Sequence, residues 1–304
     1  MIDRRSVLGL VAGAVALSAT GAMAEDWKAK YPEIVFGKIP DENASGTMDR
    51  YGPLMDFLSK EIGTKVTLRI AQDYAAVIEG QRAGQIHIGF YGPASYARAV
   101  MVGAKIEPVV IEVNEDGTKG YYSVFYVKKD SPYQKIEDLK GKNLGLVDPN
   151  STSGNNVPRF SLAKMGLEPE TFFSKVVYTG SHENAVIALG QGTVDVAANW
   201  WNDENESMLK RMERKGMAKY DDYRIIFKSE QIVNSPIAMM SDLPDDLKKA
   251  ISTALIAFPI KEPEAFKKMT DGKQKPWQPV THDAYKPVME LNKFVDELRK
   301  KKAS

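Results

Sequence analysis

Strand-like and helix-like segments alternate along this chain from residue 34 onward, and this rhythm restricts the fold more than any other feature. A strand followed by a helix and a second strand builds a mostly parallel sheet with helices on both faces. The sequence therefore predicts an α/β fold. The first series has strand-like segments at 34–37, 65–71 and 86–90, with helix-like segments at 48–62, at 74–83 and from Gly92-Pro93 onward.

A second α/β unit follows the strand-like segment 121–128. Short apolar runs that are bounded by turn residues indicate its strands, and longer periodic segments indicate its helices. We expect strands at 143–147, 175–178 and 194–198, helices at about 155–165, 181–189 and 202–214, further strands at 223–228 and 236–240, and a helix-rich region over 244–302.

The length of the chain exceeds the usual size of one hydrophobic core, so we expect two lobes. The segments 121–128 and 223–228 bracket the second unit and are the expected paired hinge strands. Lobe 1 would then comprise residues 25–120 plus 230–304, and lobe 2 would comprise residues 121–229. Paired hinges let two lobes close on a ligand, and ligands of open α/β sheets lie beyond the carboxyl ends of the strands.

Residues 1–24 have the features of a cleavable export signal. Arg4-Arg5 precede an apolar stretch over 7–19, and Ala22-Met23-Ala24 supplies a small-x-small cleavage site. The arginine pair also resembles a twin-arginine signal. Because the stretch is short for a membrane span of about 20 apolar residues, we expect a soluble mature protein in a Gram-negative periplasm, starting near Glu25.

The charge balance and the absence of cysteine exclude several classes of protein. The whole chain has 41 basic and 40 acidic residues and no cysteine, and removal of residues 1–24 leaves 39 of each charge. A neutral protein lacks the basic excess that nucleic acid or an anionic lipid surface requires. Without cysteine there is no disulfide, no thiolate metal site and no lipid anchor at the cleavage site.

Three consecutive hydroxyl side chains, Ser151, Thr152 and Ser153, lie where an apolar strand is followed by a helix; we call them the hydroxyl turn. A helix start presents free backbone N–H groups and the positive end of the helix dipole. Ser and Thr hydroxyls add donors that can rotate toward an anion. The alternative is ordinary helix capping, for which Ser, Thr and Asn are favoured. Because three hydroxyls exceed what a cap requires, we favour an oxyanion site.

Further candidate residues lie at strand ends or helix starts, where they can reach the cleft. Each also has a structural explanation, since aromatic rings are often core residues and acidic residues are favoured in the first turn of a helix. His182 begins a helix, where it can donate a hydrogen bond to an anion beside the positive dipole end. These candidates are Tyr74, Tyr91, His182, Trp200 with Trp201, Asp203 and Glu204.

Common enzyme motifs are absent from the sequence. Residues 145–154 lack the P-loop spacing, no G-x-S-x-G motif is present, and His182-Glu183 does not continue into H-E-x-x-H. Three parallel hydroxyls suit anion solvation better than one activated nucleophile. We therefore expect no catalytic residue, no cofactor and no metal.

Six short motifs are spread over nearly all of residues 25–304. They are Asp73-Tyr74-Ala75, Phe90-Tyr91-Gly92, Gly120-Tyr121-Tyr122-Ser123-Val124, Asp148-Pro149-Asn150-Ser151-Thr152-Ser153-Gly154, Gly180-Ser181-His182-Glu183-Asn184-Ala185 and Val194-Asp195-Val196-Ala197. Together they resemble the periplasmic phosphonate-binding proteins of ABC importers, within the phosphate/phosphite/phosphonate-binding group. The resemblance implies a type II periplasmic-binding fold and a non-catalytic receptor. Its lobes would close on a phosphonate-type oxyanion and deliver it to a permease in the inner membrane.

The resemblance also implies roles for individual residues. The phosphonyl group would contact the hydroxyl turn, Tyr91 and His182, and Tyr74 would close over the ligand. In aminoalkylphosphonate binders an acidic residue after the strand at 194–197 meets the ligand amine, and Glu204, or Asp203, occupies that region here.

One position departs from the family pattern. A second amine-binding carboxylate of such relatives precedes a Pro-Ile pair, where this chain has the uncharged Ser235. Trp200 also lies in a region that varies. These differences argue against 2-aminoethylphosphonate as the preferred ligand and leave phosphite, phosphate, methylphosphonate and a bulkier phosphonate ester open.

Two other functions fit part of the pattern. Tyr74, Tyr91 and Trp200 can form an aromatic cage for a quaternary-ammonium solute, in which case the hydroxyl turn is only a cap. Ser151 and His182 can act as the nucleophile and base of a phosphate-ester hydrolase. We rank the phosphonate receptor above both.

Overall fold

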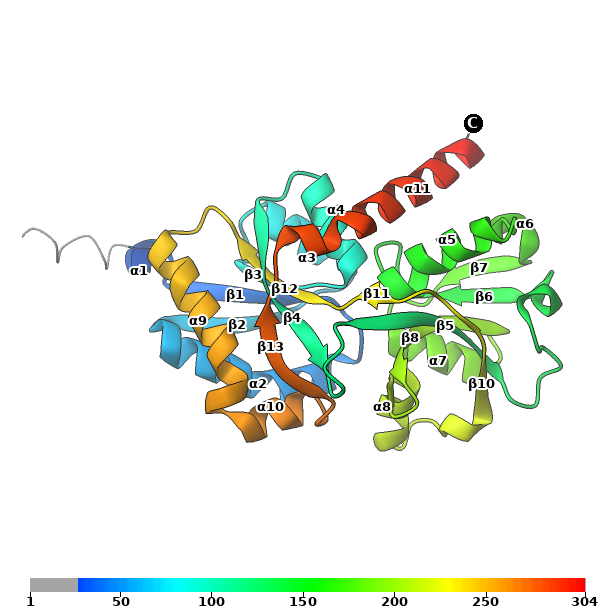
Figure 1. Ribbon diagram of the computed structural model, residues 1–304, viewed down its shortest axis with the longest axis horizontal. Coiled ribbons are helices and arrows are strands. Elements are labelled where there is room, and N and C mark those ends of the chain that lie inside the picture. The colour runs from blue at the N-terminus through cyan, green and yellow to red at the C-terminus, as the bar shows by residue number, and fades with distance from the viewer. Residues whose placement is uncertain (1–26, 304) are drawn as a thin grey trace, which may run out of the picture.

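Two β-sheets form the centres of two lobes in residues 27–303, which are the residues that the computed structural model describes (Figure 1). Figure 1 shows the lobes side by side, with helices packed around each sheet. The predicted α/β class is confirmed. The expected export signal at residues 1–24 lies outside the described residues.

The first sheet joins strands from two separate parts of the chain, in the order β13-β4-β12-β3-β1-β2. Strands β3, β1 and β2 are parallel, and β12, β4 and β13 pair antiparallel. The strands are β1 (Glu33–Lys38), β2 (Lys65–Ile70), β3 (Ile88–Phe90), β4 (Ile106–Asn114), β12 (Pro236–Met240) and β13 (Gln274–Pro279). The accompanying helices are α1 (Trp27–Lys30), α2 (Ala44–Ile62), α3 (Tyr74–Arg82), α4 (Pro93–Met101), α9 (Asp245–Lys261) and α10 (Pro263–Met269).

The second sheet lies within the middle of the chain, in the order β10-β5-β8-β6-β7, with β11 on β5 and β9 on β8. Its strands are β5 (Gly120–Lys128), β6 (Asn143–Leu146), β7 (Lys175–Tyr178), β8 (Val196–Asp203), β9 (Glu206–Ser207), β10 (Tyr223–Lys228) and β11 (Ile232–Val233). Its helical elements are η1 (Ile136–Leu139), η2 (Thr152–Asn156), α5 (Val157–Lys164), α6 (Pro169–Phe172), α7 (His182–Gly190), α8 (Met208–Arg214) and η3 (Tyr220–Asp222).

The chain crosses between the sheets twice, from β4 to β5 and from β11 to β12. Strands of the first sheet come from residues 33–114 and 236–279, and those of the second from residues 120–233. The crossings are held together by Asn114, whose Nδ2 donates to Gly120 O at 2.7 Å, and by Asn234, whose Nδ2 donates to Asn114 Oδ1 at 3.1 Å. The exact lobe boundaries, 25–120 plus 230–304 and 121–229, stay a prediction.

The final helix makes a third connection between the lobes. The chain passes through η4 (His282–Tyr285) into α11 (Lys286–Ala303), which packs on α4 of the first lobe and reaches α5 of the second (Figure 1). Arg98 on α4 forms a bidentate pair with Asp296, with distances of 2.7 and 2.6 Å. The rings of Phe160 on α5 and Phe294 on α11 meet edge to face, with centroids 5.2 Å apart.

Two expectations about secondary structure were wrong. The strand expected at 194–198 runs on to Asp203, and the helix expected from 202 begins only at Met208. A tight hairpin intervenes, because the Asp203 carboxylate accepts from the backbone N–H groups of Asn205 and Glu206 at 2.7 and 3.0 Å. Strand β13 lies in the region expected to be helix-rich; its Pro residues are tolerated because it is an edge strand.

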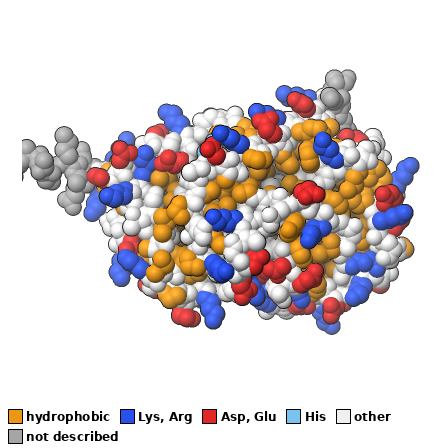
Figure 2. Space-filling view, viewed as in Figure 1, with side chains coloured by type: hydrophobic (Ala, Val, Ile, Leu, Met, Phe, Trp, Pro, Cys, Tyr) orange, Lys and Arg blue, Asp and Glu red, His pale blue; other side chains and the backbone are white. Residues whose placement is uncertain are grey.

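Basic and acidic side chains are interspersed over both lobes on the face that Figure 2 shows. This pattern agrees with the nearly balanced charge of the sequence, 41 basic against 40 acidic residues. A mixed surface does not create the one-sign field that attracts a polyanion.

Candidate functional site

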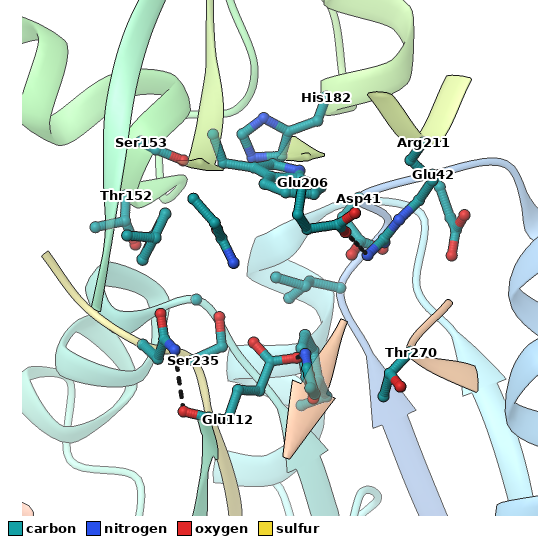
Figure 3. A pocket seen from close by; sticks show the side chains of 18 of the residues that line it. Asp41, Glu42, Glu112, Thr152, Ser153, His182, Glu206, Arg211, Ser235 and Thr270 are labelled. Carbon is teal, nitrogen blue, oxygen red and sulfur yellow. Dashed lines mark hydrogen bonds and ion pairs between the residues drawn. The ribbon is translucent and has the colours of Figure 1, made fainter. Parts of the chain in front are cut away.

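A cavity of about 100 Å³ lies between the two lobes and is lined by residues of both. This volume is large enough for several water molecules or for one small organic ion. Figure 3 shows Thr152, Ser153 and His182 on one side of it, with Ser235, Glu112 and Thr270 across from them. On the second-lobe side of the cavity, the hydroxyl turn follows the carboxyl end of β6, His182 follows that of β7, and Trp200 lies near the carboxyl end of β8, as the rule for α/β sheets predicts.

The hydroxyl turn forms the second-lobe side of this cavity, and its three side chains are buried. Ser151 is an N-cap: its backbone is extended and its Oγ accepts from Gly154 N at 3.1 Å. The next five residues make one π-helical turn, η2, before α5 begins. Such a wide turn at a helix start is frequent at functional sites. The capping explanation therefore applies to Ser151, and because the cap uses only a lone pair, the hydroxyl proton stays available to a ligand.

Two asparagines and a glycine fix the shape of the turn. Asn155 Nδ2 donates to Pro149 O at 2.8 Å, and Asn156 Nδ2 donates to Ser151 O at 3.1 Å. Gly154 packs against Val147 so closely that an added Cβ would lie 2.3 Å from the Val147 Cγ2 atom. The Asn and Gly residues beside the hydroxyls are thus required by the geometry of the turn.

Two tyrosine phenols reach the hydroxyl turn from opposite directions. The phenol of Tyr74 lies close to the Ser151 side chain, and that of Tyr121 lies close to the Thr152 and Ser153 side chains. Burial raises the pKa of each phenol above its ordinary value. Both rings stay protonated at neutral pH and can donate a hydrogen bond to an anion.

Thr152 also ties the hydroxyl turn to the first lobe. Its Oγ1 accepts from the backbone N of Ala94, at the start of α4, at 2.8 Å. The hydroxyl proton of Thr152 remains available to a ligand, because this contact uses only a lone pair.

His182 lies beside the hydroxyl turn at the start of α7 and is buried. Its Nε2 is 3.4 Å from Ser151 Oγ, and its Nδ1 is 2.9 Å from Asn199 Oδ1. Burial lowers the pKa of His182 to about 4, with Asp41 acting in the opposite direction and Lys38 reinforcing the decrease. The imidazole is therefore neutral at pH 7.

The cavity carries charges of both signs: Asp41, Glu42 and Glu112 come from the first lobe, across from the hydroxyl turn, whereas Glu206 and Arg211 come from the second lobe, on the side of His182 (Figure 3). Three of its carboxylates have cationic partners. Asp41 pairs with Lys38; Glu42 with Arg50 at 2.7 Å and Lys215 at 2.8 Å; and Glu206 with Arg211 at 3.0 Å and Arg214 at 2.6 Å.

Glu112 is the exception among the cavity carboxylates of residues 27–303, because no cation lies within ion-pair distance of it. Its Oε1 accepts from Gln274 Nε2 at 2.7 Å. Burial raises the pKa of Glu112, and the hydrogen bond from Gln274 opposes that increase. A partly buried carboxylate without a counter-ion is unfavourable, so a cationic or hydrogen-bond-donating ligand group would stabilise this wall.

The lobes are closed, and ion pairs join them at the mouth of the cavity. Lys215, just after α8, pairs with Glu42 of the first lobe, and Arg214 pairs with Asp271 at 2.9 Å. Asn43 Nδ2 donates to the two carboxylate oxygens of Glu183 at 3.1 and 3.2 Å. These contacts cross the cleft and depend on closure.

We predict that the variant Lys215→Gln binds ligand about fivefold more weakly than the native protein, since it loses the ion pairs of Lys215 with Glu42 and Glu183, which together contribute about 1 kcal/mol. Calorimetric titration at low and at high salt checks this. The native affinity should fall with salt more than that of the variant. The matched control is Lys293→Gln, which removes an exposed pair within α11. Equal salt dependence of the native protein and the Lys215 variant would contradict the role given to these pairs.

Seven of the ten residues expected at the site line the cavity. They are Tyr74, Ser151, Thr152, Ser153, His182, Trp200 and Ser235. Their contacts with a ligand stay a prediction.

Three residues expected at the site do not line it. Tyr91 is fully buried in the first lobe, where its hydroxyl donates to Gln81 Oε1 at 2.6 Å. Asp203 caps the β8–β9 hairpin, and Glu204 is at the exposed turn, where it accepts from the Tyr220 hydroxyl at 3.0 Å. The expected placement of Asp203 and Glu204 was wrong because β8 runs on to Asp203 and turns there into a hairpin. That of Tyr91 was wrong because its ring packs into the core of the first lobe.

Sequence reasoning missed several cavity residues. Tyr121 belongs to the motif over residues 120–124, but it was not expected at the site. Glu206 lies two residues beyond Glu204, the second residue of the expected acidic pair. Asp41, Glu112 and Arg211 come from distant segments with no motif around them. Among residues 27–303, no three histidine or acidic side chains are grouped to hold a metal ion.

Comparison with known proteins is consistent with this geometry. The family model described as "ABC transporter, phosphonate, periplasmic substrate-binding protein" matches residues 36–285. The chain is 33% identical over 220 residues to the phosphonates-binding periplasmic protein of Escherichia coli, covering 71% of this chain and 63% of that protein. It is 30% identical over 232 residues to the phosphate-import protein of Mycolicibacterium smegmatis, covering 73% of this chain and 71% of that one.

A solved structure has the same architecture. The binding-protein component of an ABC phosphonate transporter from Pseudomonas aeruginosa superimposes with a TM-score of 0.78 at 28% identity, covering 88% of each chain. The predicted two-lobe, type II periplasmic-binding fold is confirmed by this similarity.

Proposed function

The chain belongs to the family of periplasmic substrate-binding proteins of phosphonate ABC transporters, and we propose that it captures a phosphonate-type oxyanion between its lobes for delivery to an ABC importer. The observation that carries this proposal is the buried hydroxyl turn, with Tyr74 and Tyr121 aimed at it. Five neutral hydroxyl donors converge on one side of a small closed cavity. The protein acts as a receptor and performs no catalysis.

The donor set suits reversible capture of an anion. Hydroxyl groups and the start of a helix stabilise negative charge without a fixed counter-ion. The two arginines of residues 27–303 that line the cavity are already paired, Arg211 with Glu206 at 3.0 Å and Arg50 with Glu42 at 2.7 Å. The first-lobe wall across from the hydroxyl turn carries the carboxylates of Asp41, Glu42 and Glu112. The phosphonyl group is therefore expected at the hydroxyl turn, and its substituent is expected to face that wall.

The opposite wall favours a substituent with a cationic or donor group. Glu112 is adjacent to Ser235: the backbone N of Glu112 donates to Ser235 O at 3.3 Å. Glu112 thus supplies, from a neighbouring strand, the carboxylate that Ser235 lacks. The uncharged Ser235 argued against aminoalkylphosphonates as ligands. With Glu112 beside Ser235, these ligands, including 2-aminoethylphosphonate, fit the cavity after all.

We predict that Glu112→Gln weakens binding of 2-aminoethylphosphonate by at least about tenfold, because a hydrogen bond between charged groups contributes roughly 1.5–3 kcal/mol. Methylphosphonate should bind as tightly as before or more tightly, since the variant removes a negative charge from its cavity. Titration calorimetry measures both affinities. Glu115→Gln, at an exposed carboxylate, is the control. If both ligands lost the same affinity, Glu112 would have no role in substituent recognition.

The two alternative functions, a quaternary-ammonium binder and a phosphate-ester hydrolase, are less well supported than the phosphonate receptor. A cage for a quaternary-ammonium solute loses one wall, because Tyr91 points into the core of the first lobe. A phosphate-ester hydrolase would use Ser151, His182 and Asn199, which are arranged like a nucleophile, base and orienting group. Turnover of a chromogenic phosphate ester by the purified protein would support the hydrolase and contradict a purely receptor function.

We propose that residues 1–24 are a cleaved export signal, read by either the general or the twin-arginine route, and that the mature protein works in the periplasm. The family is periplasmic, and no helix within residues 27–303 is long and apolar enough to cross a membrane. The mass of the protein purified from the periplasm tests the cleavage site before Glu25.

The proposed function is tested by titration calorimetry of the processed protein with 2-aminoethylphosphonate, methylphosphonate, phosphite, phosphate and sulfate. We expect binding of at least one phosphorus oxyanion. Phosphate belongs in the panel because the relative from Mycolicibacterium smegmatis is a phosphate-import protein. If none of the phosphorus oxyanions bound, the proposed function would be wrong.

A further inference from the structure

The side chain of Asn199 fixes the protonation pattern of His182. Asn199 Nδ2 donates to His182 O at 2.9 Å, and Asn199 Oδ1 accepts from Trp200 N at 3.0 Å. If the Asn199 amide were flipped, its NH₂ group would face the N–H of Trp200 and its oxygen would face the carbonyl oxygen of His182. Both contacts are repulsive, so the orientation of the amide is determined. The Oδ1 atom, 2.9 Å from His182 Nδ1, therefore accepts the proton of that ring nitrogen.

The other ring nitrogen consequently has no proton. A neutral imidazole with its proton on Nδ1 presents a lone pair at Nε2. This atom is 3.4 Å from Ser151 Oγ, on the cavity side of the ring. Sequence reasoning expected His182 to donate to an anion; the geometry makes its cavity-facing atom an acceptor instead.

The ligand must supply the missing proton. Without a ligand, the Ser151 hydroxyl can donate to His182 Nε2. When an oxyanion binds, the same hydroxyl donates to the oxyanion instead. A fully ionised oxyanion then presents only lone pairs to Nε2, whereas a monoprotonated phosphonyl group presents one P–O–H. Only the monoprotonated group can accept a hydrogen bond from the Ser151 hydroxyl and also donate one to His182 Nε2.

We propose that the site binds the monoprotonated form of the phosphonyl group, with its P–O–H donated to His182 Nε2, and that Asn199 is the positioning residue imposing this selection. The inference rests on the proposed function. It gives the receptor a means of rejecting sulfate and sulfonates, which carry no proton at neutral pH. A site that hydrogen bonds a substrate hydroxyl rejects the analogue lacking it by roughly 10⁴-fold.

The charges around His182 support a neutral ring. Burial lowers its pKa to about 4, Asp41 raises it, and Lys38 and Arg211 lower it. Glu183 on the same helix is held by Asn43 and Lys215. Figure 3 also places Glu206 near His182, where Arg211 and Arg214 pair with its carboxylate. The buried phenols of Tyr74 and Tyr121, which line the same cavity, have raised pKa values and stay neutral.

The test compares methylphosphonate with its isostere methanesulfonate by calorimetry of the processed protein between pH 6 and 9. Each titration is run in two buffers of different ionisation enthalpy, which gives the number of protons taken up. The second pKa of methylphosphonate is higher than the value of about 6 for a phosphate monoester, because carbon withdraws less electron density than an ester oxygen. Above that second pKa, we expect uptake of about one proton per ligand. The affinity should fall about tenfold per pH unit there. Methanesulfonate should bind at least about 100-fold more weakly at pH 7.

Two further measurements locate the proton. Nitrogen-15 NMR of the native complex should show His182 still neutral, with its proton on Nδ1; an imidazolium signal would contradict the proposal. In Asn199→Asp, a carboxylate beside Nδ1 raises the pKa of His182 and turns Nε2 into a donor, so methanesulfonate affinity should increase.

Other outcomes separate this inference from the function. If methylphosphonate bound without proton uptake at high pH, or methanesulfonate bound equally well, the inference would be wrong and the receptor function would stand. If no phosphorus oxyanion bound at all, the function itself would fail.

Discussion

Replacement of both Ser151 and Thr152 by Ala is expected to weaken binding of every phosphonate ligand by about 10²- to 10⁴-fold. Each hydroxyl is expected to donate to a charged oxygen of the ligand, and such a bond contributes roughly 1.5–3 kcal/mol, where 1.4 kcal/mol corresponds to about tenfold in affinity. Titration calorimetry with methylphosphonate measures the loss.

The double variant also loses structural contacts, so it needs a control for stability. Ser151 caps the η2 turn, and Thr152 accepts from Ala94. The variant Ser207→Ala removes an N-cap of the same kind from α8, where Ser207 Oγ accepts from Lys210 N at 3.1 Å, and Ser207 does not line the cavity. It should lose about 1 kcal/mol of stability while keeping its affinity. If the double variant and the native protein had equal affinities, the hydroxyls of Ser151 and Thr152 would not be ligand-binding groups.

Gly154→Ala is expected to destabilise the protein and to abolish binding together. The new Cβ would lie 2.3 Å from Val147 Cγ2 and 2.8 Å from Ser151 Oγ. Because Val147 is fully buried, relief requires a shift of the turn backbone, which separates the hydroxyls from Tyr74 and Tyr121. Overpacking of this kind costs about 1–3 kcal/mol, or several degrees in Tm, and we expect more than a 100-fold loss of affinity.

The matched control for this glycine is Gly52 in α2. A Cβ added there meets nothing within 4 Å, and alanine has the higher helix propensity by about 1 kcal/mol. Gly52→Ala should therefore keep the native affinity and equal or exceed the native Tm. Thermal unfolding and calorimetry of the two variants compare them directly. Native-like affinity in Gly154→Ala would show that the turn tolerates rearrangement.

The features that could be predicted from the sequence are local ones. The hydroxyl turn, the strand before it and the helix after it lie within about 20 consecutive residues, and strand-to-helix turns follow local rules of capping and dipole. His182 was found in the same way, at a helix start capped by Ser181 Oγ, which accepts from Asn184 N at 3.0 Å. The α/β rhythm fixed the fold class because its period is local as well.

The features that could not be predicted depend on strand pairing and on distant contacts. Tyr91 and Tyr121 are both tyrosines beside a glycine, and only the tertiary fold determines which ring faces the cavity. The end of β8 depends on its hairpin with β9, which displaced Asp203 and Glu204. Glu112 reaches the cavity on β4, a strand absent from the predicted elements, so no sequence signal placed it there.

The most direct test of the central claim is a crystal structure of the processed protein with methylphosphonate. The cavity offers two rival anion positions, the hydroxyl turn and the pair of arginines Arg50 and Arg211. We predict that the phosphonyl oxygens lie within hydrogen-bond distance of Ser151, Thr152 and Ser153, with the methyl group toward Glu112. A phosphonyl group bound to Arg50 or Arg211, with the hydroxyl turn left to water, would contradict the account.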